Sequence, residues 1–77
     1  MSTIQETAEF IIKAIVSDPS QITVTGVEEN DFLHLEVSAP AETIGQIIGK
    51  EGKIIKSIRT ILNLAFPSQK YTLDIKN

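Results

Sequence analysis

The feature that most constrains the fold is a pair of glycines, Gly49 and Gly52, standing between two segments of helical periodicity. Apolar residues recur at helical spacing from about residue 41 to 48, and again from about residue 53 to 65. Glycine tolerates positive φ and allows another part of the chain to approach closely. We therefore predict two helices joined by a tight turn at residues 49–52.

The remaining residues predict one further helix and three strands. Thr3 and Glu6 have the spacing of a capping box at a helix start, and the segment 18–20, Asp-Pro-Ser, should end that helix. Alternating apolar and polar residues predict three strands, each with one buried face. These segments are 22–25, 32–38 and 71–76, with a polar hairpin turn at 28–31 between the first two.

The predicted order is helix, strand, strand, helix, helix, strand, which is an α+β arrangement. Three short strands with one apolar face each need covering on that face only. The three helices should therefore all pack on the same side of a three-stranded sheet. A chain of 77 residues without a repeat or a linker has room for one domain, so we expect residues 1–77 to form a single unit.

Composition excludes several classes of site. The chain has no cysteine and one histidine, His34, on the polar side of its strand. A thiolate or histidine metal site, a thiol nucleophile and a Ser-His-Asp triad are therefore not expected, and no residues suggest a cofactor. We predict that the protein is not an enzyme. The sequence contains neither a signal peptide nor an apolar run of membrane-spanning length, so we expect it in the cytoplasm.

Charge is distributed unevenly along the chain. The net charge is −3, but residues 45–60 carry four basic residues and one acid, whereas the rest of the chain is strongly acidic. The distribution of charge matters more for a nucleic-acid partner than its sum. A cluster of this size also arises on ordinary solvated surfaces, so the charge alone leaves both interpretations open.

The glycine pair is suited to holding a phosphate. Gly52 lies where the second helix begins, and free N–H groups at a helix N-terminus favour anions. Lys50 and Lys53 flank this point. A P-loop is excluded, because its glycines are farther apart and Ile54 stands where Ser or Thr is required. The same residues would also suit a connection that needs glycine only to turn, or a DNA-reading helix-turn-helix, although the isoleucines of the second helix argue against DNA reading.

Residues 48–58 match the pattern I-G-x-x-G-x-x-I-x-x-I without a mismatch. With its element order, the chain resembles the small stand-alone bacterial KH-domain RNA-binding proteins, often called the KhpA type. The resemblance covers essentially the whole sequence. It implies a type II-like KH domain, with a three-stranded mixed sheet in which the last two strands are adjacent and parallel. In KH domains the GxxG loop clamps about four nucleotides of a single strand by their backbone.

The resemblance implies a role for individual residues. The loop would hold phosphates, two isoleucines would line an apolar groove under the bases, and two lysines would extend the electrostatic contact. These residues are Gly49, Lys50, Glu51 and Gly52 for the phosphates, Ile47 and Ile48 for the groove, and Lys53 and Lys56 for the charge. The second strand, around residues 35–38, would form the opposite wall. Glu51 and Gln46 depart from the residues frequent in the family, and both predict weaker RNA binding.

The second helix of the pair is more apolar than a core stripe requires. Ile54, Ile61 and Leu64 widen its apolar arc, which is explained either by a helix wrapped on several sides or by an oligomer interface. The resemblance favours self-association to a homodimer and pairing with a larger KH protein of the Jag type. It also implies a small RNA chaperone or post-transcriptional regulator. The alternative is a protein-interaction module with little affinity for RNA.

Overall fold

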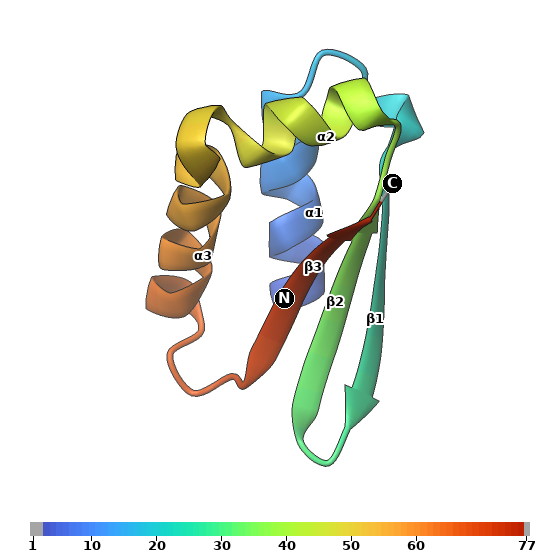
Figure 1. Ribbon diagram of the computed structural model, residues 1–77. Coiled ribbons are helices and arrows are strands. Elements are labelled where there is room, and N and C mark those ends of the chain that lie inside the picture. Colours follow the sequence, from blue (N-terminus) through green and yellow to red (C-terminus); the bar gives the residue numbers. More distant parts are fainter. Residues whose placement is uncertain (1–2, 77) are drawn as a thin grey trace.

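The computed structural model describes residues 3–76, and its element order is the predicted one (Figure 1). The helices and strands are α1 (Ile4–Ile15), β1 (Thr23–Glu29), β2 (Phe32–Ser38), α2 (Ala41–Ile48), α3 (Lys53–Ala65) and β3 (Tyr71–Lys76). Two short 3₁₀ turns, Pro19–Gln21 and Lys50–Gly52, lie between them. The predicted limits of α3 agree with the structure.

The sheet is mixed, with the strand order β1-β2-β3. β1 and β2 pair antiparallel, and β2 and β3 pair parallel, which confirms the sheet expected of a KH domain. The predicted turn at residues 28–31 is too long. Asn30 and Asp31 alone make it, both at positive φ, so the ladder continues to the pair Glu29 and Phe32. A two-residue turn of this kind matches the twist of the flanking strands, and Glu29 therefore stays in β1.

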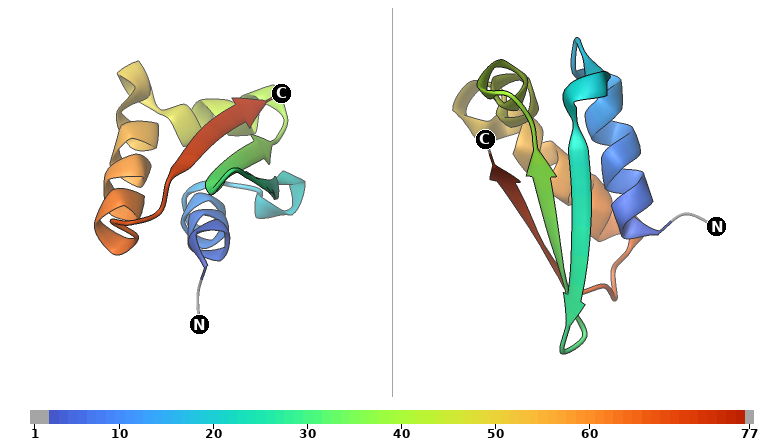
Figure 2. Two further views of the ribbon diagram at one scale, coloured as in Figure 1. Left: turned by 90° about the horizontal axis from the view of Figure 1, so that it is seen from below. Right: turned by 90° about the vertical axis from the view of Figure 1, so that its right-hand side faces the viewer.

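All three helices cover the same face of the sheet, as predicted (Figure 2). Between them lies a core of side chains with little or no exposure. Its largest fully buried members are Ile12, Leu35, Val37, Ile47 and Leu62. The other face of the sheet has no helix over it (Figure 2).

The N-terminal helix begins at the predicted capping box. The Glu6 N–H donates to Thr3 Oγ1 at 3.1 Å, and the Thr3 N–H donates to Glu6 Oε1 at 2.9 Å. Phe10, whose side the sequence does not decide, is 76 % exposed on the outer surface of α1. Among the described residues, no helix is both long enough and apolar enough to cross a membrane.

Candidate nucleic-acid interface

The glycine loop, residues 49–52, connects α2 to α3 at one end of the domain (Figure 1). Gly49 has φ 75° and ψ 177°, a combination that is essentially restricted to glycine. A β-carbon at this position would also lie 2.6 Å from Cγ1 of Ile54. Gly52 has φ 73°, but no atom lies within 4 Å of its β-carbon position. Gly49 is therefore required for both conformation and space, and Gly52 for conformation only.

Backbone hydrogen bonds decide which amides of the loop face a ligand. The Gly49 N–H makes the last bond of α2, to the Gly45 carbonyl at 3.0 Å. The N–H groups of Gly52 and Lys53 donate back to the carbonyls of Gly49 and Lys50. The amides of Lys50 and Glu51 lie between these two sets, so they are the loop's candidate donors for a phosphate. The start of α3, where the sequence predicts free amides, is partly used by the 3₁₀ turn.

Glu51 adopts a backbone conformation that is unusual for its residue type. Its φ of 58° and ψ of 23° lie in the left-handed region, which costs most non-glycine residues about 1–2 kcal/mol. The residue is exposed and its carboxylate stands in the middle of the loop. Glu51 thus adds both strain and negative charge at the point that would face a phosphate.

Exposed lysines surround the loop. Lys50, Lys53 and Lys56 are all exposed. Within residues 3–76 the ion pairs are Lys13 with Glu9 and Lys76 with Glu36, so no carboxylate of the described chain pairs with these three lysines. Their charges are available to a ligand.

A groove of about 440 Å³ runs between α3 and β3. We call it the α3–β3 groove; its lining residues are Arg59, Asn63, Tyr71, Thr72, Leu73 and Asp74. This corrects the expectation that residues 35–38 form the wall opposite the glycine-flanked helix. β2 is the central strand, and its Leu35 and Val37 have no exposed surface. The edge strand β3 is the one that stands beside α3.

Side-chain contacts connect the two walls of this groove. The guanidinium of Arg59 donates through Nη2 to the Leu73 carbonyl at 3.1 Å. The Tyr71 hydroxyl donates to Asn63 Oδ1 at 2.9 Å and lies 3.3 Å from the Arg59 carbonyl oxygen. Burial raises the pKa of Tyr71, and the Arg59 guanidinium lowers it in part, so the phenol stays protonated and can donate.

Sequence reasoning missed Tyr71, Asn63 and Asp74 as residues of the site. The helical spacing of Arg59 and Asn63, four residues apart, places them on one flank of α3. No sequence pattern, however, shows that this flank faces the edge of β3, because that depends on how the helix and sheet pack.

The two groove isoleucines differ in position. Ile47 has no exposed surface, so the prediction that it lines a ligand groove is wrong. The residue belongs to the hydrophobic core. Ile48 is 37 % exposed at the end of α2 and is the one of the two that a base could reach. Gln46 has a structural function, since its amide accepts from the Ser17 N–H at 2.9 Å and donates to the Ser17 hydroxyl at 2.7 Å.

The apolar residues of α3 form a separate flank. Ile54, Ile61 and Leu64 are 38 %, 47 % and 78 % exposed, and we call them the apolar flank. At 3.6 residues per turn, Ile61 lies about 200° around the helix from Arg59. The apolar flank therefore faces away from the α3–β3 groove.

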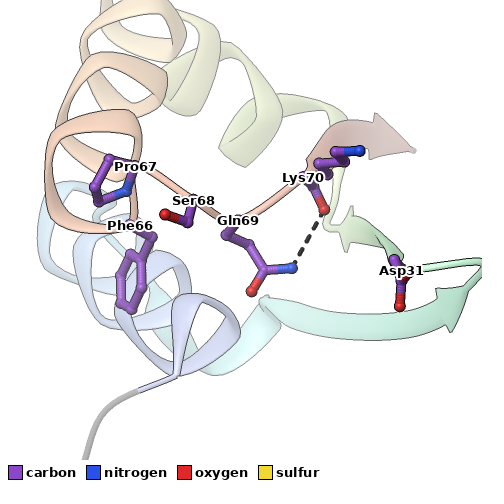
Figure 3. Close-up of a pocket in the computed structure, with 6 residues that line it drawn as sticks. All are labelled: Asp31, Phe66, Pro67, Ser68, Gln69 and Lys70. Carbon is purple, nitrogen blue, oxygen red and sulfur yellow. Dashed lines mark hydrogen bonds between the residues drawn. The ribbon is translucent and has the colours of Figure 1, made fainter.

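A second hollow, of about 490 Å³, lies between the α3–β3 loop and the β1–β2 turn (Figure 3). The Gln69 side chain donates to the Lys70 carbonyl at 3.3 Å, and the Gln69 N–H donates to the Phe66 carbonyl at 3.1 Å. The side chains of Asp31 and Lys70 point apart in Figure 3, so no set of charged groups converges there. The hollow is at the opposite end of the domain from the glycine loop (Figure 1), and we assign it no site.

Two helices joined by a G-x-x-G loop, set between the second and third strands of a three-stranded mixed sheet, define a KH domain. A family model described as "KhpA/KhpB, KH domain" matches residues 5–75, and the chain belongs to this family. The resemblance inferred from the sequence is thereby confirmed.

Individual relatives cover most of the chain. A Clostridium perfringens protein named RNA-binding protein KhpA is 36 % identical over 61 residues, which are 79 % of this chain and 81 % of that protein. Proteins of the same name from Treponema pallidum and Chlamydia pneumoniae are 34 % identical over 73 residues and 40 % identical over 58 residues. These matches cover 92 % and 75 % of this chain, and 91 % and 74 % of the respective relatives. No solved structure gives a significant match.

Proposed function

We propose that this protein binds single-stranded RNA, with the backbone held at the glycine loop and the bases lying along the α3–β3 groove. The observation that carries the proposal is the geometry of the loop. Gly49 and Gly52 turn the chain so that the amides of Lys50 and Glu51 lie outside the hydrogen bonds of both helices. Backbone amides exposed in this way form a site for a phosphate oxygen. The names of the relatives support RNA as the ligand.

A single strand fits the site better than a duplex. Bases that are not paired can be turned toward the edge of β3, where backbone and side-chain groups lie within reach. The exposed side chain of Ile48 gives an apolar contact beside the loop. Lys53 and Lys56 extend the positive charge along α3 from the loop toward the groove. Acting on RNA in the cytoplasm, such a domain would serve as a small chaperone or post-transcriptional regulator without catalysing a reaction.

We further propose that the protein self-associates through the apolar flank of α3. Leu64 and Ile61 expose most and about half of their side chains, respectively, to solvent. Exposed apolar residues gathered on one side of a helix typically mark an association surface. Because this flank faces away from the α3–β3 groove, a homodimer would leave both grooves open. A second KH-domain protein could use the same flank, which keeps a protein-interaction role as the alternative function.

The decisive experiment is the substitution Lys50→Asp, with RNA binding measured by fluorescence anisotropy at low salt. Lys50 is exposed between two glycines, so the variant should remain folded by circular dichroism and cost about 0.5 kcal/mol of stability or less. With Glu51 beside it, the loop becomes doubly negative, and we expect binding to be lost. The control is Lys70→Asp, which makes the same charge change before β3, away from the loop. A folded Lys50→Asp variant that binds as wild type would overturn the proposal.

A further inference from the structure

The outer edge of β3 is the wall of the α3–β3 groove that could distinguish one base from another. The Leu33 N–H bonds to the Lys70 carbonyl, and the Ala39 N–H bonds to the Lys76 carbonyl. Even-numbered residues of β3 therefore direct their backbone groups toward β2, since these directions alternate along a strand. The N–H and C=O groups of Tyr71, Leu73 and Ile75 face the groove side instead.

Arg59 changes what this edge offers to a base. Its Nη2 already donates to the Leu73 carbonyl, so that the edge's central acceptor is occupied by a cation. A guanidinium has five N–H donors in a planar fork, and this contact uses one of its two terminal nitrogens. The contact between Tyr71 and Asn63 holds the same stretch of α3 against β3. At this point the groove presents donors where an uncovered strand edge would present an acceptor.

Asp74 lines the same groove and carries the opposite charge. Its side chain alternates with that of the buried Leu73, so it leaves β3 on the face of the sheet that no helix covers, beside the ion pair of Lys76 with Glu36. Arg59 and Asp74 do not form an ion pair with each other, and neither belongs to the two ion pairs found within residues 3–76. The edge of β3 thus carries a donor fork on its helix side and a carboxylate on its uncovered side, and the two are not paired with one another. A ligand with acceptor and donor groups on one edge could bridge them.

We propose that the α3–β3 groove is a guanine-selective base pocket, in which Arg59 donates to the O6 and N7 side of the base and Asp74 accepts from its N1–H and N2–H groups. This inference rests on the proposed single-stranded RNA binding. An arginine paired with O6 and N7 is the commonest specific contact to guanine. A carboxylate has two oxygens that accept only, and it matches two adjacent N–H donors.

The other bases fit this pair of groups less well. Adenine and cytosine each carry one exocyclic amino group and no ring N–H beside it on the pairing edge. Uracil has a ring N–H between two carbonyl oxygens, so a carboxylate placed there meets an acceptor as well as a donor. Guanine combines an acceptor with two neighbouring donors on one edge. Each good bidentate contact discriminates by about five- to tenfold or more.

The test uses four seven-nucleotide RNAs that are uridine throughout except at the central position, which is G, A, C or U. We expect wild-type protein to bind the G-containing RNA about five- to tenfold more tightly than the other three in anisotropy titrations. Equal affinity for all four, or a preference for A or C, would overturn the inference. If Lys50→Asp removes binding but wild type shows no preference for G, the RNA-binding proposal stands and only the base pocket fails.

Variants separate base reading from a structural role of Arg59 at the strand edge. Arg59→Lys keeps the charge but lacks the planar fork, so it should retain most of its affinity and lose the preference for G. Asp74→Asn should also lose this preference, while binding to the A-containing RNA is unchanged or improved, because asparagine matches adenine. If both variants, checked for folding by circular dichroism, keep the wild-type ratio of affinities, the residues do not read the base.

Two substitutions provide matched charge controls. Glu28→Gln removes an acid from β1, at the sheet edge opposite β3, and should strengthen binding to all four RNAs alike. Lys56→Gln removes a cation from α3 without touching the edge of β3, and should weaken binding to all four RNAs by one common factor. A change in the G preference in either control would mean that net charge, and not the two groove residues, sets the ratio.

Discussion

The side chain of Ile54 closes over Gly49 so tightly that a β-carbon at residue 49 would lie 2.6 Å from the isoleucine Cγ1. This contact joins the first turn of α3 to the end of α2. It helps to hold the glycine loop, in which the Lys50 and Glu51 amides lie between the hydrogen bonds that end α2 and those that begin α3. The loop is therefore specified by packing as well as by the backbone freedom of its glycines.

We predict that Gly49→Ala destabilises the domain much more than Gly52→Ala. The first substitution forces a non-glycine residue into φ 75°, ψ 177° and collides with Ile54, for a cost of about 2–4 kcal/mol. The second meets open space at φ 73° and should cost about 1–2 kcal/mol. Urea denaturation at one protein concentration measures both values.

The double variant Gly49→Ala with Ile54→Ala separates the cost of the backbone strain at residue 49 from the cost of the collision with Ile54. Ile54→Ala removes Cγ1 and Cδ1 but keeps Cβ, which lies 2.8 Å from the added β-carbon, so it relieves part of the collision and leaves the backbone strain. The two changes should therefore cost less together than the sum of their separate costs. Additive costs would show that the contact between the two residues does not limit stability.

Replacing Glu51 with asparagine should improve both stability and binding. Asparagine tolerates the left-handed conformation that Glu51 adopts, so we expect a gain of several tenths of a kcal/mol in the free energy of unfolding. The loss of the carboxylate should also tighten RNA binding, and Glu51→Lys should tighten it further. Thermal unfolding and anisotropy titrations measure the two effects. Weaker RNA binding by either folded variant would contradict a phosphate site at the loop.

Salt should weaken RNA binding moderately. About three to four cations near the strand correspond to a slope of log K against log salt of roughly −2 to −3 for single-stranded RNA. The candidates are Lys50, Lys53, Lys56 and Arg59. Removing one phosphate-contacting lysine, as in Lys56→Gln, should reduce the slope by about 0.7. Titrations at several salt concentrations give both slopes, and a preference for duplex RNA would argue against the proposed site.

Self-association should depend on the apolar flank of α3. Light scattering of wild-type protein at tens of micromolar should show a dimer, and Ile61→Asp should give a folded monomer, because a buried carboxylate opposes the contact. The exposure of Ile61, at 47 %, allows the change without loss of the fold. A wild-type protein that remains monomeric at high concentration would contradict the proposed self-association.

A matched control for the dimer is Phe10→Asp. Phe10 is 76 % exposed on α1 and does not belong to the apolar flank. The Phe10→Asp variant introduces the same charge as Ile61→Asp but should leave the oligomeric state unchanged. If it disrupts the dimer as Ile61→Asp does, the association surface includes α1 and not α3 alone.

Local patterns in the sequence were sufficient to predict the helices, the strands and the glycine loop. The capping residues Thr3 and Glu6 fixed the start of α1, and the glycine pair fixed the turn between α2 and α3. These features depend on interactions over a few residues, which spacing along the chain reveals directly. For the same reason the short turn at Asn30 and Asp31 was placed correctly, although its length was overestimated.

The arrangement of the groove was decided only by tertiary packing. Spacing along α2 does not tell Ile47, which is buried, from Ile48, which is exposed, because each is four residues or fewer from another apolar residue and either could face the core. The sequence also does not show that Arg59 reaches the Leu73 carbonyl. Strand order places β2 in the centre and β3 beside α3. That order depends on contacts between residues far apart in the chain, so the sequence determined the loop and its charges, and the fold determined which strand edge lies opposite them.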